Sequence, residues 1–448
     1  MKRSTANNAF LTRLVIVLSL LWAASASAVP SYARQTGQAC SACHVGAFGP
    51  QLNGFGRQFK LLGYTMSNGK SSLPLSAMLV ESYSQTSKDL SDKAGPYDGT
   101  NNNAALQQLS LFVAGKLSTH IGMFSQITYS DIDRKVAMDN FDIRYAKPFS
   151  RGEHAGVFGV SVNNNPGVSD LRHTLAAWRF PFISSEFTPG PMAGPLIDGG
   201  LGQQVIGADA YVSLDSKFYG SFGLYKTLSR SLLDDMNVDY GGRISGAAPY
   251  WRFSWEPQLS GQTLALGDFG LNARLQPDGS GTPTDKYNDY GVDAAYERPM
   301  SNGNLLTLNG SFTHESNRLN SAFLAGEADR AGHSLGSTAF NASYYFKNTY
   351  GLSFGWFNVT GGRDDALYAA EPDFGSGNGS PSSRGEILQA DWTPFGKPDS
   401  WHQPWANMRL GVQYTHFDHL NGGSSNYDGF GRNASDNDTL FLFVWLAM

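Results

Sequence analysis

Apolar and polar residues alternate along most of the chain with a period of two, as expected for β-strands whose two faces meet different surroundings. Between residues 306 and 313, for example, Leu308 and Phe312 share one face, whereas Thr307 and Asn309 share the other. Sixteen such segments follow residue 74. They are centred near Leu79, Val113, Thr128, Arg144, Val160, Tyr211, Phe222, Phe253, Asn272, Ala294, Leu308, Ala342, Phe354, Ala390, Val412 and Phe443.

Short and long connections largely alternate between these segments. The long polar connections are predicted at Thr86–Ala104, Asn164–Gln203, Thr227–Ala247, Asn317–His333, Gly361–Arg384 and Asp418–Asp438. Outer-membrane barrels have an even number of antiparallel strands, short periplasmic turns and long external loops. We therefore predict an all-β fold, an antiparallel outer-membrane β-barrel of about 16 strands over residues 74–448 that encloses an aqueous lumen. The alternative is a soluble β-sandwich or propeller. A soluble all-β protein has no reason to place its long loops at one end, and a propeller would show a blade-like repeat, which is not evident.

The composition agrees with a strand-rich protein that faces a membrane. Of the 448 residues only 16% are charged, 13% are aromatic and 51 are glycine. An average soluble domain has about 25% charged residues. The net charge of −5 excludes a basic nucleic-acid-binding protein. Beyond the N-terminus, no apolar run approaches the roughly 18 residues of a transmembrane helix.

The N-terminus has the pattern of an export signal. Lys2, Arg3 and Arg13 precede the apolar run 14–24, and the small residues 26–28 follow it. This order predicts a signal peptide over residues 1–28, with a single membrane anchor as the alternative. Cleavage after Ala28 would remove three positive charges and change the net charge from −5 to −8. The mature protein is therefore expected outside the cytoplasm.

The only two cysteines of the chain, Cys40 and Cys43, are followed directly by His44. This Cys-x-x-Cys-His spacing is typical of c-type haem attachment, in which two thiols bond to the porphyrin vinyl groups and the histidine ligates the iron. A redox dithiol would require a βαβ context, and a zinc site would require further nearby ligands. Residues 29–73 are therefore predicted to be a monohaem cytochrome c segment with one covalent haem c. So short a segment should also pack against the rest of the chain.

Other ligands of the haem are less clearly marked. Met66 is a candidate for the sixth ligand of the iron, although a methionine at any one position is more often a packing residue. Arg57 and Lys60 follow the motif closely enough to pair with haem propionates. Arg57 is the stronger candidate, because Lys60 is expected at the surface.

Two stretches resemble a known family. The first contains residues 30–37, the Cys40–His44 motif, Leu52-Asn53, residues 56–60 and Gly63-Tyr64; the second contains residues 164–166, Asp170-Leu171, Ala177-Trp178 and residues 180–182. Together they resemble the fused monohaem cytochrome–porins of the bacterial outer membrane, best known as iron(II)-oxidising cytochromes. About a fifth of the chain carries the resemblance, and the remaining barrel matches in architecture only.

The resemblance implies that a haem-bearing N-terminal plug lies inside or beneath a porin, on the periplasmic side or within the lumen. Electrons would pass from extracellular Fe(II) to a periplasmic cytochrome c or copper protein, which would make the protein an Fe(II)-oxidising oxidoreductase. Cys40 and Cys43 would hold the haem and His44 would ligate its iron. The alternatives are a haem-bearing porin or conduit for another donor, and a structural barrel with a regulatory haem.

The predicted reaction needs no acid–base residue, so no catalytic residue is named. It does need donors for Fe(II), which accepts carboxylates and imidazole. Three clusters in or near predicted external loops offer such groups, although solvated loop charges are their simpler interpretation. They are Asp364, Asp365, Glu371 and Asp373; Asp234, Asp235 and Asp239; and His416, Asp418 and His419.

Overall fold

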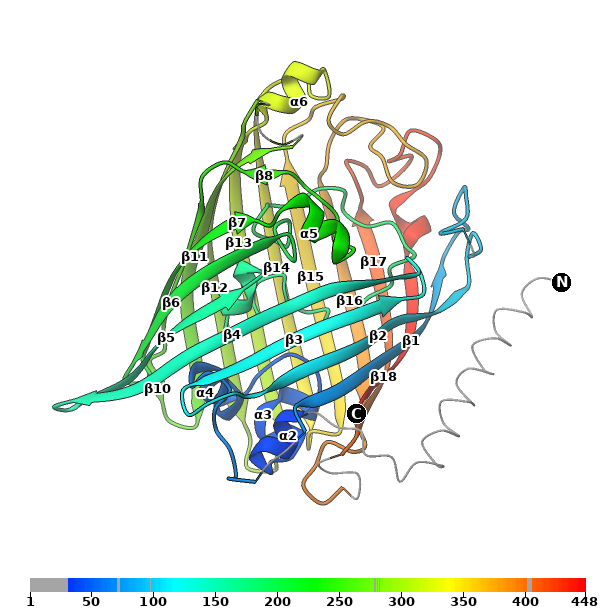
Figure 1. Cartoon of the computed structure of the whole chain (residues 1–448). Helices are drawn as coiled ribbons and strands as arrows, with labels where there is room; N and C mark the ends of the chain where they lie inside the picture. The colour runs from blue at the N-terminus through cyan, green and yellow to red at the C-terminus, as the bar shows by residue number, and fades with distance from the viewer. Residues whose placement is uncertain are drawn as a thin grey trace.

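The structure is a computed structural model that describes residues 31–70, 73–96, 98–277, 279, 281, 283–400 and 405–448. The predicted signal peptide, residues 1–28, lies outside the described residues. Within them, the chain forms one antiparallel sheet in which each long strand pairs with the next long strand along the chain and β18 pairs with β1 (Figure 1). The sheet is therefore a closed barrel without a free edge.

Sixteen strands form the wall of the barrel. They are β1 (Leu75–Thr86), β2 (Asn103–Lys116), β3 (Ile121–Ser130), β4 (Lys135–Arg151), β5 (His154–Asn163), β6 (Val205–Leu214), β7 (Phe218–Thr227), β9 (Ala248–Trp255), β11 (Gln262–Gln276), β12 (Asp285–Pro299), β13 (Leu305–Arg318), β14 (Gly332–Phe346), β15 (Tyr350–Gly361), β16 (Ser383–Trp392), β17 (Asn407–His419) and β18 (Thr439–Ala447). Two short strands, β8 (Arg243–Ile244) and β10 (Gln258–Leu259), continue the pairing of β9 with β11 at its two ends. All sixteen predicted centres lie within these wall strands, which confirms the predicted barrel.

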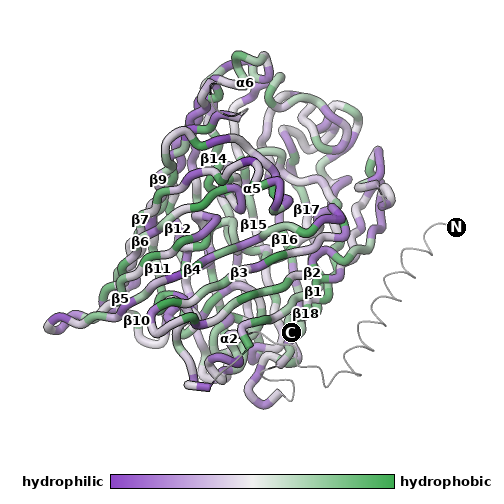
Figure 2. Tube along the Cα trace, in the orientation of Figure 1, coloured by the Kyte–Doolittle hydropathy of each residue, from purple (hydrophilic) through white to green (hydrophobic). Residues whose placement is uncertain are grey.

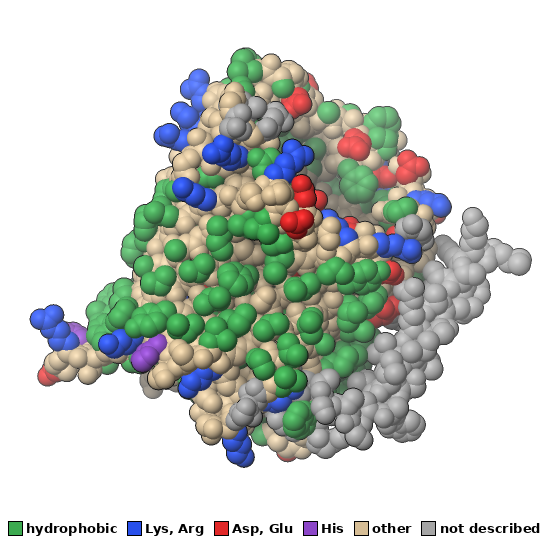
Figure 3. Space-filling view, viewed as in Figure 1, with side chains coloured by type: hydrophobic (Ala, Val, Ile, Leu, Met, Phe, Trp, Pro, Cys, Tyr) green, Lys and Arg blue, Asp and Glu red, His purple; other side chains and the backbone are tan. Residues whose placement is uncertain are grey.

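The barrel is polar inside and apolar outside. On β13 the polar residues Thr307, Asn309 and Ser311 are buried, whereas Phe312, on the opposite face, is exposed. The same holds around the wall, where Leu352 of β15 is 63% exposed. Hydrophobic and hydrophilic residues alternate along the wall strands (Figure 2). On the face shown in Figure 3, apolar side chains form a band across the wall, and charged side chains gather above and below it. An apolar outer face of this kind is that of an outer-membrane β-barrel, because lipid covers it.

The connections divide between the two ends of the barrel. Because consecutive strands are antiparallel, the long loops 87–102, 164–204, 228–247, 319–331, 362–382 and 420–438 all start from one end, shown at the top of Figure 1. The opposite end has mainly short turns, such as 117–120 and 347–349. This arrangement matches the alternation expected from the sequence.

The helices are short, and none of them forms part of the barrel wall. They are α2 (Ser31–Thr36), α3 (Cys40–Cys43), α4 (Gly54–Leu61), α5 (Arg230–Asp235) and α6 (Asn320–Ala325), with 3-10 turns η1 (Val45–Ala47), η2 (Pro166–Ser169) and η3 (Ala434–Asn437). No helix among the described residues is long and apolar enough to cross a membrane.

The N-terminal segment, residues 31–64, lies in the short-turn end of the lumen (Figure 1). Tyr32 donates to a backbone oxygen of β3, and Tyr64 donates to Asp142 of β4 at 2.6 Å. On other parts of the wall, Tyr211 of β6 donates to Leu61 O, and Arg409 of β17 donates to Phe48 O at 2.8 Å. Strands around the whole circumference therefore contact this segment, which places it inside the barrel.

The lumen loop, residues 164–204, also lies inside the barrel. Gln107 of β2 donates to Ser184 O, and Gln413 of β17 donates to Ile183 O. The backbone N–H of Leu196 donates to Glu315 of β13 at 2.7 Å. The sequence predicted this stretch as an external loop, and that part of the prediction is wrong. The polarity of this loop could not distinguish an external position from one inside the lumen, because the lumen is polar as well.

Candidate functional site

The Cys-x-x-Cys-His motif lies at the short-turn end of the lumen. Cys40 and Cys43, both thiols, start and end the single helical turn α3, and His44 follows in an extended conformation. Residues three apart on a helical turn face the same side. Burial, with a contribution from Cys40, raises the pKa of the Cys43 thiol to about 12. A redox dithiol has a lowered pKa instead, so the surroundings disfavour that alternative.

The residues after His44 are fastened to the wall. Gly46 has φ 65° and lies against the ring of Tyr345, so the turn has no room for a side chain. Asn407 of β17 donates to Ala47 O at 2.6 Å. These contacts hold the turn that follows His44. The residue as a whole is half-buried, and its ring atom Nδ1 is buried without a hydrogen-bond partner. Burial, together with the charge of Arg409, lowers the pKa of His44 to about 4, so the imidazole is neutral at neutral pH.

A second histidine, which the sequence did not single out, is buried in the lumen loop. His173 of the lumen loop is only 6% exposed, and neither of its ring nitrogens has a hydrogen-bond partner. Its ring packs edge-on against Trp178, with the ring centroids 5.3 Å apart. Burial lowers the pKa of His173 well below its usual value, and Lys60 and His44 contribute to the shift. Within the part of the chain that the structure describes, this imidazole is therefore buried without a hydrogen-bond partner.

Asp170 organises the turn that presents His173. Its carboxylate accepts hydrogen bonds from the backbone N–H groups of Arg172, Thr174 and Leu175, at 2.7–3.0 Å. Although burial alone would raise the pKa of Asp170, Arg252 and these hydrogen bonds lower it overall. A permanently charged carboxylate thus fixes the backbone on both sides of His173.

Lys60 is buried beside this turn, which corrects the expectation that it lies at the surface. It is 3% exposed, donates to Asp170 O at 3.0 Å, and places its amine 4.8 Å from the ring centre of Trp178. Among the described residues, no carboxylate forms an ion pair with it. Burial lowers the pKa of Lys60 to about 7, and the charge of Arg144 adds to the effect. This buried amine therefore lacks an anionic partner.

Arg57 and Met66 are placed differently. Arg57 donates to both carboxylate oxygens of Glu297 on β12 and to Leu52 O, so protein acceptors occupy its guanidinium. Met66 is half-buried, and its backbone oxygen accepts a hydrogen bond from Gln35. A contact of either residue with haem stays a prediction.

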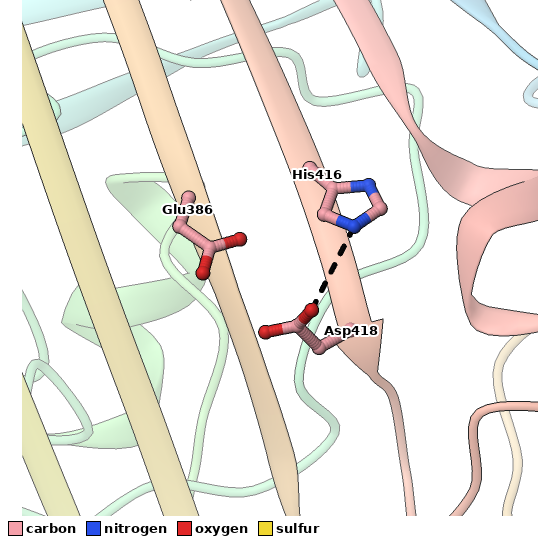
Figure 4. Close-up of side chains that lie close together, drawn as sticks. All are labelled: Glu386, His416 and Asp418. Atoms are coloured by element: carbon pink, nitrogen blue, oxygen red, sulfur yellow. Dashed lines mark ion pairs between the residues drawn. The ribbon is translucent and has the colours of Figure 1, made fainter.

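One of the three predicted iron clusters is brought together in part. Oxygen and nitrogen atoms of His416 and Asp418 on β17 lie within 4.8 Å of one another and of Glu386 on β16 (Figure 4). Glu386 was not predicted, because strand register rather than sequence proximity pairs it with His416. His419 is not part of this outer cluster, as we call Glu386, His416 and Asp418. It is the only group of three such ligands among the described residues.

The outer cluster faces away from the lumen. Leu388, two residues beyond Glu386 on the same face of β16, is 53% exposed, and Tyr414, two residues before His416, is exposed as well. Thr415 and Phe417, on the opposite face of β17, line the lumen cavity instead. The wall therefore separates this cluster from the N-terminal segment.

The other two clusters do not converge. Asp364 accepts backbone hydrogen bonds from the loop 319–331, and Asp373 accepts from Ser91 and pairs with Arg432 at 3.1 Å. These two carboxylates tie the long loops together. Asp239 pairs with Lys135 at 3.6 Å at the surface. In the structure, Asp364, Asp373 and Asp239 thus make contacts within and between loops.

A cavity of about 590 Å³ lies between the lumen loop and the wall from β13 to β18. Its lining mixes neutral polar residues, such as Ser311, Ser337 and Asn341, with apolar ones, such as Phe180 and Trp356. Thr174, which also lines the cavity, directly follows His173 in the chain. The cavity therefore reaches the turn that carries the buried histidine.

No protein-family model matches the chain, and a comparison with curated protein sequences likewise finds no match. Its structure is similar to an anion-selective porin from Comamonas acidovorans (9% identity, TM-score 0.43, covering 83% of this chain and 98% of the porin). It is also similar to the outer membrane channel DcaP of Acinetobacter baumannii (12% identity, TM-score 0.45, covering 85% of this chain and 99% of the channel). Function has to be argued from the residues of this chain.

Proposed function

We propose that the N-terminal segment carries one covalent haem c and that the protein transfers electrons from an extracellular donor, Fe(II), to a periplasmic cytochrome c or copper protein. The observation that carries the proposal is the Cys40–Cys43–His44 turn at the short-turn end of a closed barrel lumen. In this proposal the N-terminal segment is the haem-bearing plug, and residues 29–73 act as a unit distinct from the barrel.

The surroundings of the motif suit a haem better than a single metal ion. Among the described residues, the two cysteines, His44 and His173 do not form a group that could hold one ion. Structural zinc needs four ligands in one tetrahedron. A porphyrin, in contrast, separates its thioether links from its axial ligands. The thiols of Cys40 and Cys43 would form the links, and His44 would ligate the iron.

The buried amine of Lys60 supports the proposal independently. A haem brings propionate groups, and a buried charge is stabilised only when it is paired. We infer that Lys60, rather than Arg57, pairs with a propionate, because Glu297 already holds Arg57. When bound, the haem would accept one electron from the donor and release one to the acceptor, so that each Fe(II) leaves as Fe(III).

The residues of the barrel would control access to this centre. The donor would enter from the long-loop end and reach the cavity. One of the residues that line this cavity, Thr174, belongs to the turn of residues 170–175. Acceptor would approach from the short-turn end, where the N-terminal segment lies. The wall and the lumen loop would keep the two reactants apart.

The test is stopped-flow absorbance of the purified, oxidised protein mixed with Fe(II). Rapid appearance of the reduced c-type haem spectrum supports the proposal. If dithionite reduces a covalently bound haem but Fe(II) does not, the donor is another compound and the protein is a conduit for it. If denatured protein carries no covalent haem, the proposal is wrong.

A further inference from the structure

Among the residues that the structure describes, His173 is the one buried side chain with two polar atoms that lack a hydrogen-bond partner. Both of its ring nitrogens lack a partner at 6% exposure. A neutral imidazole has one donor and one acceptor nitrogen, and a buried polar group without a partner is destabilising because it has lost its hydrogen bonds to water. Buried groups of this kind call for a ligand or an ion that satisfies them.

The position of His173 points to the nature of that ligand. The turn that carries His173 contacts the N-terminal segment, because Lys60 of α4 donates to Asp170 O at 3.0 Å across 110 residues of the chain. Trp178 packs against one side of the His173 ring, and the amine of Lys60 lies over Trp178. His173 therefore lies where the lumen loop meets the N-terminal segment, beside the group proposed to bind a propionate.

We propose that His173 is the second axial ligand of the haem iron, so that the lumen loop and the N-terminal segment clamp the haem from opposite sides. This inference rests on the proposed function, because it requires the haem at Cys40 and Cys43. Met66, the candidate from the sequence, is the alternative sixth ligand that the experiment below distinguishes from His173.

The turn around His173 is built to hold its ring in one place. The three backbone hydrogen bonds to Asp170 fix residues 172–175, and Arg252 pairs with the same carboxylate at 3.2 Å. These contacts hold the backbone that carries the imidazole. The backbone of His173 itself is left-handed, with φ 55°, a conformation that non-glycine residues adopt at a cost.

Two histidine ligands would also set the electron-transfer properties. Methionine ligation raises the potential of a c-type haem relative to histidine ligation. A bis-histidine haem would therefore be a better reductant for the periplasmic acceptor. Because Thr174 lines the cavity, the ligand His173 would lie on the donor side of the haem.

The experiment uses electron paramagnetic resonance and redox titration of the purified, oxidised holoprotein. In the wild type we expect a six-coordinate, low-spin haem. His173→Ala should lose the low-spin signal and become high-spin, and added imidazole should restore it, which also shows that the variant is folded. His173→Met should remain low-spin with a more positive potential. His154→Ala, which removes an exposed histidine at the β4–β5 turn, should match the wild type.

Several outcomes would overturn the inference. A low-spin signal and a potential that are unchanged in both His173 variants would exclude His173 as a ligand. Loss of the low-spin signal in Met66→Ala instead would return the assignment to Met66. The haem content, measured after denaturation, separates this failure from failure of the proposed function. A wild-type protein that holds haem with another ligand refutes only the inference, whereas a protein without covalent haem refutes both.

Discussion

Arg57 on helix α4 and Glu297 on strand β12 form two hydrogen bonds, although 240 residues separate them in the sequence. Arg172 of the lumen loop donates to the same carboxylate at 3.3 Å. One buried carboxylate thus joins the N-terminal segment, the lumen loop and the wall. Breaking one partner of a buried ion pair is costly because it leaves the other charge without compensation.

Arg57→Ala should therefore loosen the N-terminal segment from the barrel. We expect a loss of up to about 3–5 kcal/mol of docking free energy, reduced by the remaining contact with Arg172. Limited proteolysis should cleave the segment faster in the variant than in the wild type. The matched control is Lys88→Ala, whose exposed pair with Asp436 should contribute less than about 1 kcal/mol. Equal proteolysis of the two variants would contradict the prediction.

The sequence predicted the wall of the barrel well because each strand carries its own signal. Alternation shows that Thr307 and Phe312 lie on opposite faces, whatever the tertiary fold. Alternation alone does not show which face points into the barrel. The loop lengths indicated an outer-membrane barrel, and such a barrel has its polar face inside. The position of the lumen loop could not be predicted in this way, because the contacts of Leu196 with Glu315 and of Gln413 with Ile183 link distant parts of the chain.

The candidate site was predictable only where its residues are adjacent in sequence. Cys40, Cys43 and His44 form a local motif, and the structure keeps them on one turn and the residue after it. Glu386 is brought to its neighbours by strand register, and His173 by the fold of the lumen loop. Neither residue is part of a recognisable motif in its own segment. Lys60 was misplaced because lysine is rarely buried without an ion pair.

Lys60 should make stability depend on pH. Its pKa is about 7 in the folded protein, against 10.5 for an ordinary lysine. Between these values the unfolded chain binds a proton that the folded protein does not, so the unfolding free energy should rise with pH by at most about 1.4 kcal/mol per unit. Below about pH 7 this contribution stays constant. The measurement is chemical unfolding in detergent at several pH values, with haem-free Cys40→Ala/Cys43→Ala protein.

Lys60→Met should remove this dependence in the haem-free protein. In the holoprotein, a propionate partner would raise the pKa of Lys60 toward its ordinary value, and the slope should fall there as well. An identical slope in the haem-free protein with and without Lys60→Met would show that another group causes it. A slope that persists unchanged in the holoprotein would argue against the proposed propionate contact.

The apolar outer face makes a direct prediction about membrane stability. Val292, near the middle of β12, is 55% exposed. Val292→Arg should cost about 2–4 kcal/mol in a lipid bilayer, the cost of arginine at the midplane of a barrel. Unfolding in vesicles by guanidinium measures it. Phe430→Arg, in the loop 420–438 and also exposed, is the control and should have little effect. Similar losses in both would place the lipid band elsewhere.

The outer cluster should not take part in electron transfer to the haem. Because Glu386, His416 and Asp418 face away from the lumen, a combined Glu386→Gln/Asp418→Asn change should leave the rate of haem reduction by Fe(II) unchanged. Binding of Co²⁺ to the cluster, followed by its visible absorption, should weaken in the same variant. A clear fall in the reduction rate would mean that Fe(II) binds on the outer face first.

The cavity beside the lumen loop should instead limit the rate. Ser337 of β14 is buried and lines it, so Ser337→Trp should fill part of the cavity and slow haem reduction by Fe(II). The haem potential should stay the same, because the change does not reach the axial ligands. Ser337→Ala removes the hydroxyl without filling space and should react like the wild type. Overpacking costs about 1–3 kcal/mol, so heat-modified mobility on gels is needed to show that the barrel is folded. If a folded Ser337→Trp protein is reduced at the wild-type rate, donor reaches the haem by another route, and approach from the short-turn end becomes the alternative to test.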